Sequence, residues 1–196
     1  MDGTDRRRLG LRLRELRRLR GLTTRALSER SGVSSSMINQ IETATTGASA
    51  TSLRRIASGL DVPLADFFLS GDPVAAASDG GAAAGSVSVV RRSERRRLEL
   101  PESHISYELL TPDLSSGIEF VWIELEPGHP PVEPMPHPGR ECCVVIAGTL
   151  TSVIGEREYT LEPGDSIVFD CSIPHTTENR GSERVIQISA ISPARF

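Results

Sequence analysis

The chain has 196 residues, of which 38% are hydrophobic and 24% charged, as expected for a soluble globular protein of one ordinary or two small domains. No apolar run approaches the ~20 residues that a membrane-spanning helix needs, and the arginine-rich N-terminus lacks the apolar core of a signal peptide. Three cysteines are too few and too clustered for a secreted disulfide framework. We therefore expect a cytoplasmic protein with no membrane partner.

The net charge of −4 is the sum of oppositely charged parts. Residues 1–70 carry +5, residues 71–100 carry +1 and residues 101–196 carry −10. Phosphate binding depends on local rather than total charge, so the N-terminal part remains a candidate for nucleic-acid binding. The acidic C-terminal part would be repelled by phosphate.

A composition shift predicts where the two parts separate. Residues 71–86 are rich in Ala, Gly and Ser and contain no large apolar side chain apart from Val74. Such a segment cannot bury enough surface to offset its ordering entropy. We predict a flexible linker at 71–86, between one domain at 1–70 and another at 87–196.

The N-terminal part shows helical periodicity, because apolar residues recur there at three- and four-residue spacing. Five helices are predicted, over about 5–20, after the cap Thr23, from Ser34 to Glu42, near 50–59 and from Pro63 onward. A helix, a short glycine-containing turn and a second helix form the geometry that places the second helix in the DNA major groove.

The stretch Leu13–Phe68 resembles the DNA-binding domain of the XRE repressors, a family with a five-helix, lambda-repressor-like fold. The resemblance is carried by Gly21-Leu22-Thr23, Leu27-Ser28-Glu29, Gly32-Val33-Ser34 and Ile38-Asn39-Gln40-Ile41-Glu42. It implies that DNA is contacted by Thr24, Ser34, Ser35, Ser36, Asn39 and Gln40. Asn and Gln suit bidentate contact with adenine. The resemblance also implies that Arg17 pairs with Glu42.

Two features depart from the family pattern. Thr24 stands where the family usually has Gln, and the loop at 43–47 is neutral where the family usually has a basic one. Each missing phosphate contact lowers affinity, so a helical domain that has lost DNA binding is the alternative. A cluster of arginines on or near the first helix favours DNA binding: Arg6, Arg7, Arg8, Arg12, Arg14, Arg18 and Arg20.

From Val87 onward the period changes to two. Short β-branched runs at 119–125, 142–151, 158–161, 166–169 and 184–191 are separated by turns containing Gly or Pro. This spacing is typical of a β-sandwich or barrel. Residues 142–146 are apolar on both faces, so we expect the second sheet and a dimer partner to cover them.

Two motifs in this part resemble those of the cupins, which form a double-stranded β-helix barrel. They are Gly128…His137-Pro138-Gly139-Arg140-Glu141…Gly148 and Gly164-Asp165…Asp170…Pro174-His175…Asn179. The resemblance implies that His137, Glu141 and His175 hold one divalent metal, with Met135 at the remaining ligand position. Two imidazoles and one carboxylate suit iron, zinc or nickel.

The alternative to a metal centre is an effector pocket with hydrogen-bonded histidines. In either case we expect Met135, Arg140 and Cys143 to lie in the effector pocket. Cys142, Cys143 and Cys171 could sense redox state or a soft metal, although a buried free cysteine more often acts as a small hydrophobic residue.

The combined features predict a bacterial transcriptional regulator of the XRE–cupin type, associated with the nucleoid when bound to DNA. A homodimer would bind two half-sites of a double-stranded operator, and the cupin domain would dimerise and sense a small-molecule effector. No catalytic residue is expected. The alternatives are a non-haem iron oxygenase or epoxidase with an accessory helix-turn-helix domain, and a protein-interaction module.

Overall fold

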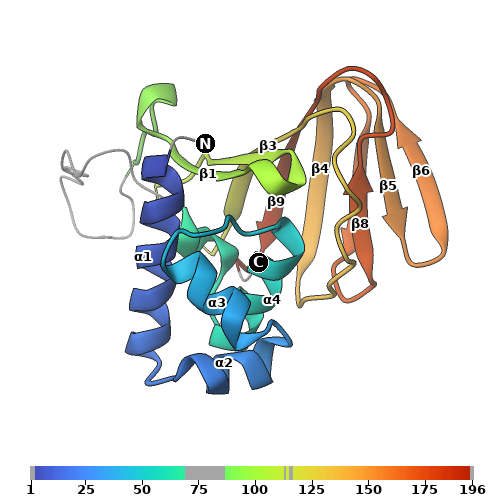
Figure 1. Ribbon diagram of the computed structural model, residues 1–196. Coiled ribbons are helices and arrows are strands. Elements are labelled where there is room, and N and C mark those ends of the chain that lie inside the picture. Colours follow the sequence, from blue (N-terminus) through green and yellow to red (C-terminus); the bar gives the residue numbers. More distant parts are fainter. Residues whose placement is uncertain (1–2, 69–86, 113, 115–116, 195–196) are drawn as a thin grey trace.

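The computed structural model describes residues 3–68, 87–112, 114 and 117–194, so the predicted linker lies outside the described residues. The helices are α1 (Gly3–Leu19), α2 (Thr24–Ser31), α3 (Ser35–Glu42) and α4 (Ala50–Leu60), followed by the 3₁₀ turn η1 (Leu64–Phe67). They form a bundle that lies beside a β-domain (Figure 1). The predicted fold class, helical followed by all-β, is confirmed.

The predicted fifth helix is wrong, because η1 is a single 3₁₀ turn of four residues. Asp61 ends α4 in the left-handed conformation, and the chain is extended again at Pro63 and at Phe68. Four of the five residues from 64 to 68 are buried, so the segment has no polar face with which to continue as an amphipathic helix.

Hydroxyl caps define the starts of the helices around the turn between α2 and α3. Thr23 accepts a hydrogen bond from the backbone N–H of Ala26, and Ser34 accepts one from Met37. Gly32, between the two helices, has a φ of 70°, which a residue without a Cβ adopts without strain. The predicted helix–turn–helix geometry therefore forms as the caps indicate.

The β-domain has nine strands in its described part, arranged in two antiparallel sheets (Figure 1). One sheet has the order β1-β2-β3-β9-β4-β7 and the other the order β6-β5-β8. The strands are β1 (Arg96–Leu100), β2 (Ile105–Leu109), β3 (Glu119–Leu125), β4 (Arg140–Ala147), β5 (Leu150–Ile154), β6 (Arg157–Leu161), β7 (Ser166–Asp170), β8 (His175–Glu178) and β9 (Val185–Ser192).

The predicted run at 142–151, which contains the turn residue Gly148, is divided between β4 and β5, which belong to different sheets. Gly148 makes the break: its φ is 71°, and a Cβ there would lie 2.5 Å from the Arg184 carbonyl oxygen. Strands β1, β2 and β8 are additions to the predicted set. β8 has only four residues and begins at the predicted ligand His175, so it is too short to show a clear alternating pattern in the sequence.

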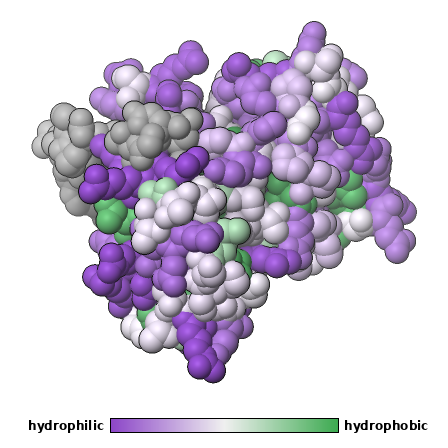
Figure 2. All heavy atoms as spheres, viewed as in Figure 1, coloured by the Kyte–Doolittle hydropathy of each residue, from purple (hydrophilic) through white to green (hydrophobic). Residues whose placement is uncertain are grey.

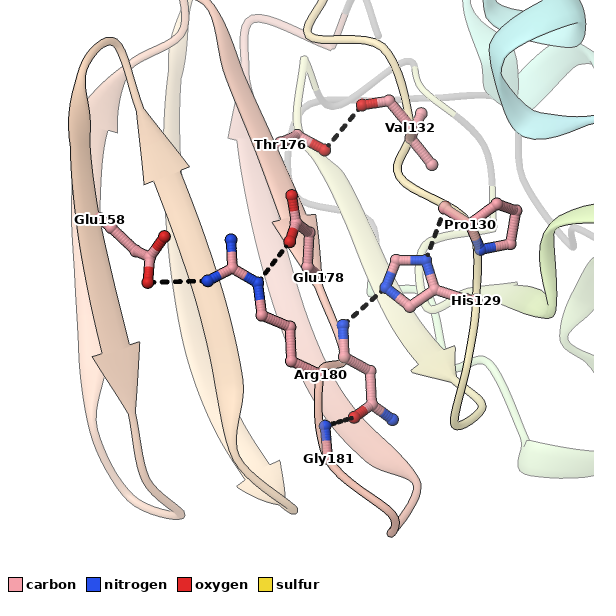
Figure 3. Close-up of polar contacts among 9 residues, drawn as sticks. His129, Pro130, Val132, Glu158, Thr176, Glu178, Arg180 and Gly181 are labelled. Atoms are coloured by element: carbon pink, nitrogen blue, oxygen red, sulfur yellow. Dashed lines mark hydrogen bonds and ion pairs between the residues drawn. The ribbon is translucent and has the colours of Figure 1, made fainter.

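The loop at 126–139, between β3 and β4, is bonded to β8 and to the residue that follows it (Figure 3). The buried His129 accepts a hydrogen bond at Nε2 from the Asn179 backbone N–H, 2.6 Å away, while its Nδ1 donates to the Pro130 carbonyl. Burial lowers the pKa of His129, which keeps the ring neutral and its Nε2 an acceptor. Further along, Thr176 donates to the Val132 carbonyl at 3.0 Å.

The opposite side of this loop contacts α4. Thr51 accepts a hydrogen bond from the Glu133 backbone N–H at 3.2 Å, and Arg55 forms an ion pair with the Glu133 carboxylate. The loop therefore lies between the helical domain and the β-domain and is bonded to both. One hydrophobic core continues across this boundary, where the rings of Phe68 and Tyr107 lie 6.1 Å apart.

The N-terminus of α4 is completed by the β-domain. Ser49 caps it in the usual way, but the buried backbone N–H of Ala50 donates to the side chain of Ser103, at 2.7 Å. A buried helix end must find partners for its free N–H groups, and here one partner comes from the other domain.

Replacing Ser103 with alanine leaves the Ala50 N–H without its acceptor in a buried position, so we expect a loss of about 1–2 kcal/mol in the free energy of unfolding. Urea denaturation followed by circular dichroism measures it. Ser93→Ala, at an exposed position, is the control and should leave the midpoint unchanged. Equal stability of S103A and wild type would contradict this role.

Candidate functional site

The first candidate site is the outward face of α3. Ile38 and Ile41 are buried, whereas Ser36, Asn39 and Gln40 are exposed and point away from the bundle. The structure therefore brings three of the residues predicted to contact DNA onto one solvent-facing surface. Met37 is 38% exposed next to them and was not predicted; an apolar side chain there suits contact with a thymine methyl group.

The other residues predicted to contact DNA lie at helix starts. The hydroxyl oxygen of Ser34 is occupied as the cap of α3, with 3.2 Å to the Met37 nitrogen. Ser35 is half-buried in the first turn of α3, and Thr24 is half-buried as the first residue of α2. Backbone groups and hydroxyls at helix N-termini are typical phosphate contacts.

The implied pair of Arg17 and Glu42 is confirmed and is bidentate. The Arg17 Nε lies 2.6 Å from one Glu42 oxygen and Nη2 lies 2.8 Å from the other, with side chains 11% and 5% exposed. Arg17 also donates to the Leu22 carbonyl, and its hydrogen bond to Glu42 raises its pKa. Removing one member of such a pair typically costs about 3–5 kcal/mol, so the pair holds α3 against α1.

Several cations of the predicted basic cluster make bonds within the protein. Arg12 donates to the Asp66 carbonyl, Arg20 to the Leu60 and Asp61 carbonyls, and Arg6 pairs with Glu102 at 3.5 Å. Arg7, Arg14 and Arg18 are exposed. Hydrophilic residues cover much of the surface over α1 and α2 (Figure 2).

The second candidate site is a cluster of four potential metal ligands in the β-domain, His137, Glu141, Cys171 and His175, of which His137 is half-buried and the other three are buried. Their ligand atoms all lie within 4.8 Å of one another. The His175 Nε2 and a Glu141 oxygen are 4.0 Å apart, too far for a hydrogen bond but suitable for two ligands of one ion. We refer to these four residues as the buried cluster.

The two imidazoles are oriented by backbone carbonyls. The Nδ1 of His137 donates to the Pro138 oxygen at 3.2 Å, and the Nδ1 of His175 donates to the Ile173 oxygen at 2.9 Å. Metal-binding histidines typically have this arrangement, which leaves Nε2 with its lone pair for the ion. Burial lowers the pKa of His137, which favours the neutral form that binds metals.

Cys171 was not predicted as a ligand, yet the structure places it with the three that were. It is fully buried, and backbone hydrogen bonds tie it to the loop: His137 donates to the Cys171 carbonyl, and Cys171 donates to the Gly139 carbonyl. Burial raises the pKa of its thiol to about 12, so without a cation beside it the thiol is protonated.

The other two cysteines lie outside the buried cluster. Cys143 is buried and donates to the Gln187 side chain at 3.3 Å, and burial raises its pKa to about 12. Cys142 is exposed on the opposite face of β4. The three are free thiols in this structure.

A cavity adjoins the buried cluster, with Glu141 and His175 in its wall. Its described lining does not include Met135, Arg140 or Cys143, the residues predicted for the effector pocket. Met135 is half-buried and Arg140 is exposed. Instead, the wall contains three residues of the helical domain that were not predicted: Arg54, Leu64 and Phe68.

Two family models match the chain in the order in which these sites occur. A helix-turn-helix domain matches residues 8–67, and a cupin domain matches residues 121–191. The first covers the bundle that presents α3, and the second covers the strands that carry the buried cluster.

Comparisons over the whole chain agree with this arrangement. The HTH-type transcriptional regulator PuuR of Escherichia coli is 24% identical over 188 residues, covering 95% of this chain and 96% of PuuR. An HTH_3 family transcriptional regulator from Vibrio cholerae is similar in structure, with a TM-score of 0.73, 24% identity and 98% of each chain covered. Hydroxypropylphosphonic acid epoxidase from S. wedmorenis shares the fold less closely, with a TM-score of 0.50, 18% identity and coverage of 94% and 97%.

The chain consists of a helix-turn-helix domain followed by a cupin domain. In this order of domains it is similar, over nearly its whole length, to the two transcriptional regulators named above. Among the described residues, none of the helices has the length and hydropathy needed to cross a bilayer.

Proposed function

We propose that this regulator binds a specific double-stranded operator as a homodimer and that its cupin domain responds to a small molecule. The observation that carries the proposal is the two-sided construction of α3. One side is fixed by Ile38, Ile41 and the Arg17–Glu42 pair, and the other presents Asn39 and Gln40 to solvent. A rigid helix with exposed amides suits readout of base edges in the major groove.

The outer face of the six-stranded sheet supports the homodimer. Phe120, Ala190, Cys142 and Val168 form one continuous row across β3, β9, β4 and β7. Phe120 is 38% exposed and Val168 is 54% exposed, although the solvent-facing side of an antiparallel sheet is normally polar. A second copy packed on the same face would cover this row and carry two recognition helices, one for each half-site.

Val168→Asp tests the dimer. A charge at Val168, the end of the apolar row on β7, should prevent association, so we expect a monomer by sedimentation velocity where the wild type is a dimer. Thr160→Asp, on the exposed face of β6, is the matched control and should remain dimeric. A dimeric V168D protein, or a monomeric wild type, would contradict this interface.

Asn39→Ala and Gln40→Ala test the recognition helix. Each substitution removes exposed amide groups without altering the core, so we expect each to weaken operator binding by roughly tenfold to a hundredfold. Gel-shift titration on a duplex selected by the wild type measures the effect. Ser58→Ala, at an exposed position on α4, should leave the affinity unchanged. Unchanged affinity in both amide variants would exclude α3 as the reading element.

We also propose that the buried cluster holds one divalent metal ion, with all four residues as ligands. The donor set fits a divalent metal ion. Two imidazoles donate from Nδ1 to backbone carbonyls, a carboxylate oxygen lies 4.0 Å from the His175 Nε2, and a thiol completes the set. A thiolate favours zinc over the harder ions, and zinc accepts four such ligands tetrahedrally. When bound, the ion stabilises the thiolate and fixes His137 to the strands.

Cobalt substitution tests this ligand set. Protein loaded with Co²⁺ should show the near-ultraviolet absorption of a cobalt–thiolate bond, and Cys171→Ser should abolish that band. Cys143→Ser is the matched control, because Cys143 is equally buried but lies outside the cluster. A band that persists in C171S, or wild-type protein that takes up no metal, would refute the proposed site.

One observation favours a second candidate, a non-haem iron oxygenase. His137, Glu141 and His175 form the two-histidine, one-carboxylate set of such enzymes, and the fold resembles the epoxidase. Against it, a fourth protein donor takes a position that an oxygenase leaves open for substrate or dioxygen. Dioxygen uptake by the Fe(II)-loaded protein would favour the enzyme.

A further inference from the structure

The cavity beside the buried cluster has walls from both domains. The strands and loops of the β-domain supply most of the described lining, and Arg54 of α4 with Leu64 and Phe68 of the η1 segment supply the rest. This cavity in the β-domain is therefore closed on one side by the helical domain.

One face of α4 is turned toward this boundary. Thr51, Arg54 and Arg55 are spaced i, i+3 and i+4, so they lie on the same side of the helix. Thr51 and Arg55 bond to Glu133 of the β3–β4 loop, while Arg54 extends into the cavity wall. Arg54 lines the same cavity as Glu141 and His175, so its guanidinium and two members of the buried cluster face one space.

We propose that Arg54 is an effector-binding residue and that the effector is a small carboxylate, held between the Arg54 guanidinium and the buried cluster. This inference rests on the proposed function, because it assigns the ligand through which the regulator would be controlled. The planar guanidinium matches a carboxylate with two parallel hydrogen bonds, which an ammonium group does not.

Both signs of charge line the cavity, and its cation is the group that would bind a carboxylate. Arg54 supplies the only guanidinium or ammonium group in the described lining. Of the two lining carboxylates, Glu141 belongs to the buried cluster, where the proposed metal ion would take up its charge. Glu119 lies across β9 from Glu141, since both pair with Ile191, and it is the group that an amine would use.

The size of the cavity connects the ligand with DNA binding. Its volume of about 40 Å³ has room for about three water molecules. Acetate is near this limit, whereas a longer dicarboxylate such as succinate must push the walls apart. Because α4 and η1 form part of the wall, a longer carboxylate shifts the helical domain relative to the cupin domain and changes the placement of α3.

Isothermal titration of the full chain with acetate, succinate, ethylamine and ethylenediamine tests the proposal. We expect the wild type to bind the carboxylates and not the amines, and Arg54→Gln to weaken succinate binding by about tenfold or more. Arg54→Lys keeps the charge but loses the bidentate hydrogen bonds, so its affinity for succinate should lie between those of the wild type and R54Q. Arg25→Gln removes the same charge from an 87% exposed site on α2 and should match the wild type.

Succinate binding that is equal in R54Q and wild type overturns the proposal, and so does wild-type protein that binds no carboxylate or prefers the amines. Circular dichroism of R54Q and R54K serves as the control that both variants are folded. Operator affinity measured without any small molecule tests the proposed function separately. If the protein binds the operator but no carboxylate, only the effector assignment fails. If the protein binds a carboxylate through Arg54 but no operator, the regulatory function fails and the ligand site stands.

Discussion

The free N–H groups at the start of α4 set the constraint on which the relative placement of the two domains depends. A helix can end inside a protein only if these groups find acceptors there, and local capping by Ser49 satisfies one of them. The Ala50 N–H is buried and bonds to Ser103 of the other domain. The helix that packs the DNA-binding bundle is therefore complete only when the cupin domain lies against it.

The same contact places the β3–β4 loop between the two domains. Glu133 of this loop is held by Thr51 and Arg55 on the α4 side, and Val132 is held by Thr176 on the β8 side. The same loop supplies His137, four residues after Glu133, to the buried cluster. The other three members of the cluster come from β4, the β7–β8 turn and β8. A ligand that moves His137 or the cavity wall therefore acts on a segment that α4 also holds, which gives a physical route from the cupin domain to α3.

The sequence predicted those features that depend on local chemistry. The caps at Thr23 and Ser34 and the strand at 119–125 could be inferred because spacing and side-chain type determine them, and the Arg17–Glu42 pair was implied by the family resemblance. The fifth helix was wrong, and the run at 142–151 did not show that its two parts belong to different sheets; both have a common reason. Burial from all sides at 64–68 and a close backbone contact at Gly148 are tertiary effects, which local periodicity does not report.

The candidate site shows the same division. The resemblance to the cupin motifs implied His137, Glu141 and His175 as ligands, and the structure brings them together. Cys171 and Arg54 reach the same region from positions that no motif marks: one through backbone bonds to the loop at 137–139, the other through the packing of a second domain. Residues contributed across a domain boundary can be found only once the two domains are placed.

The central claim is that an α3-bearing dimer reads a symmetric DNA sequence, and selection from a random-sequence duplex pool tests it most directly. The full-length wild-type protein should enrich an inverted repeat whose half-sites are separated by about one helical turn or a multiple of it. Enrichment of no sequence, or of a single site without two-fold symmetry, would contradict the account.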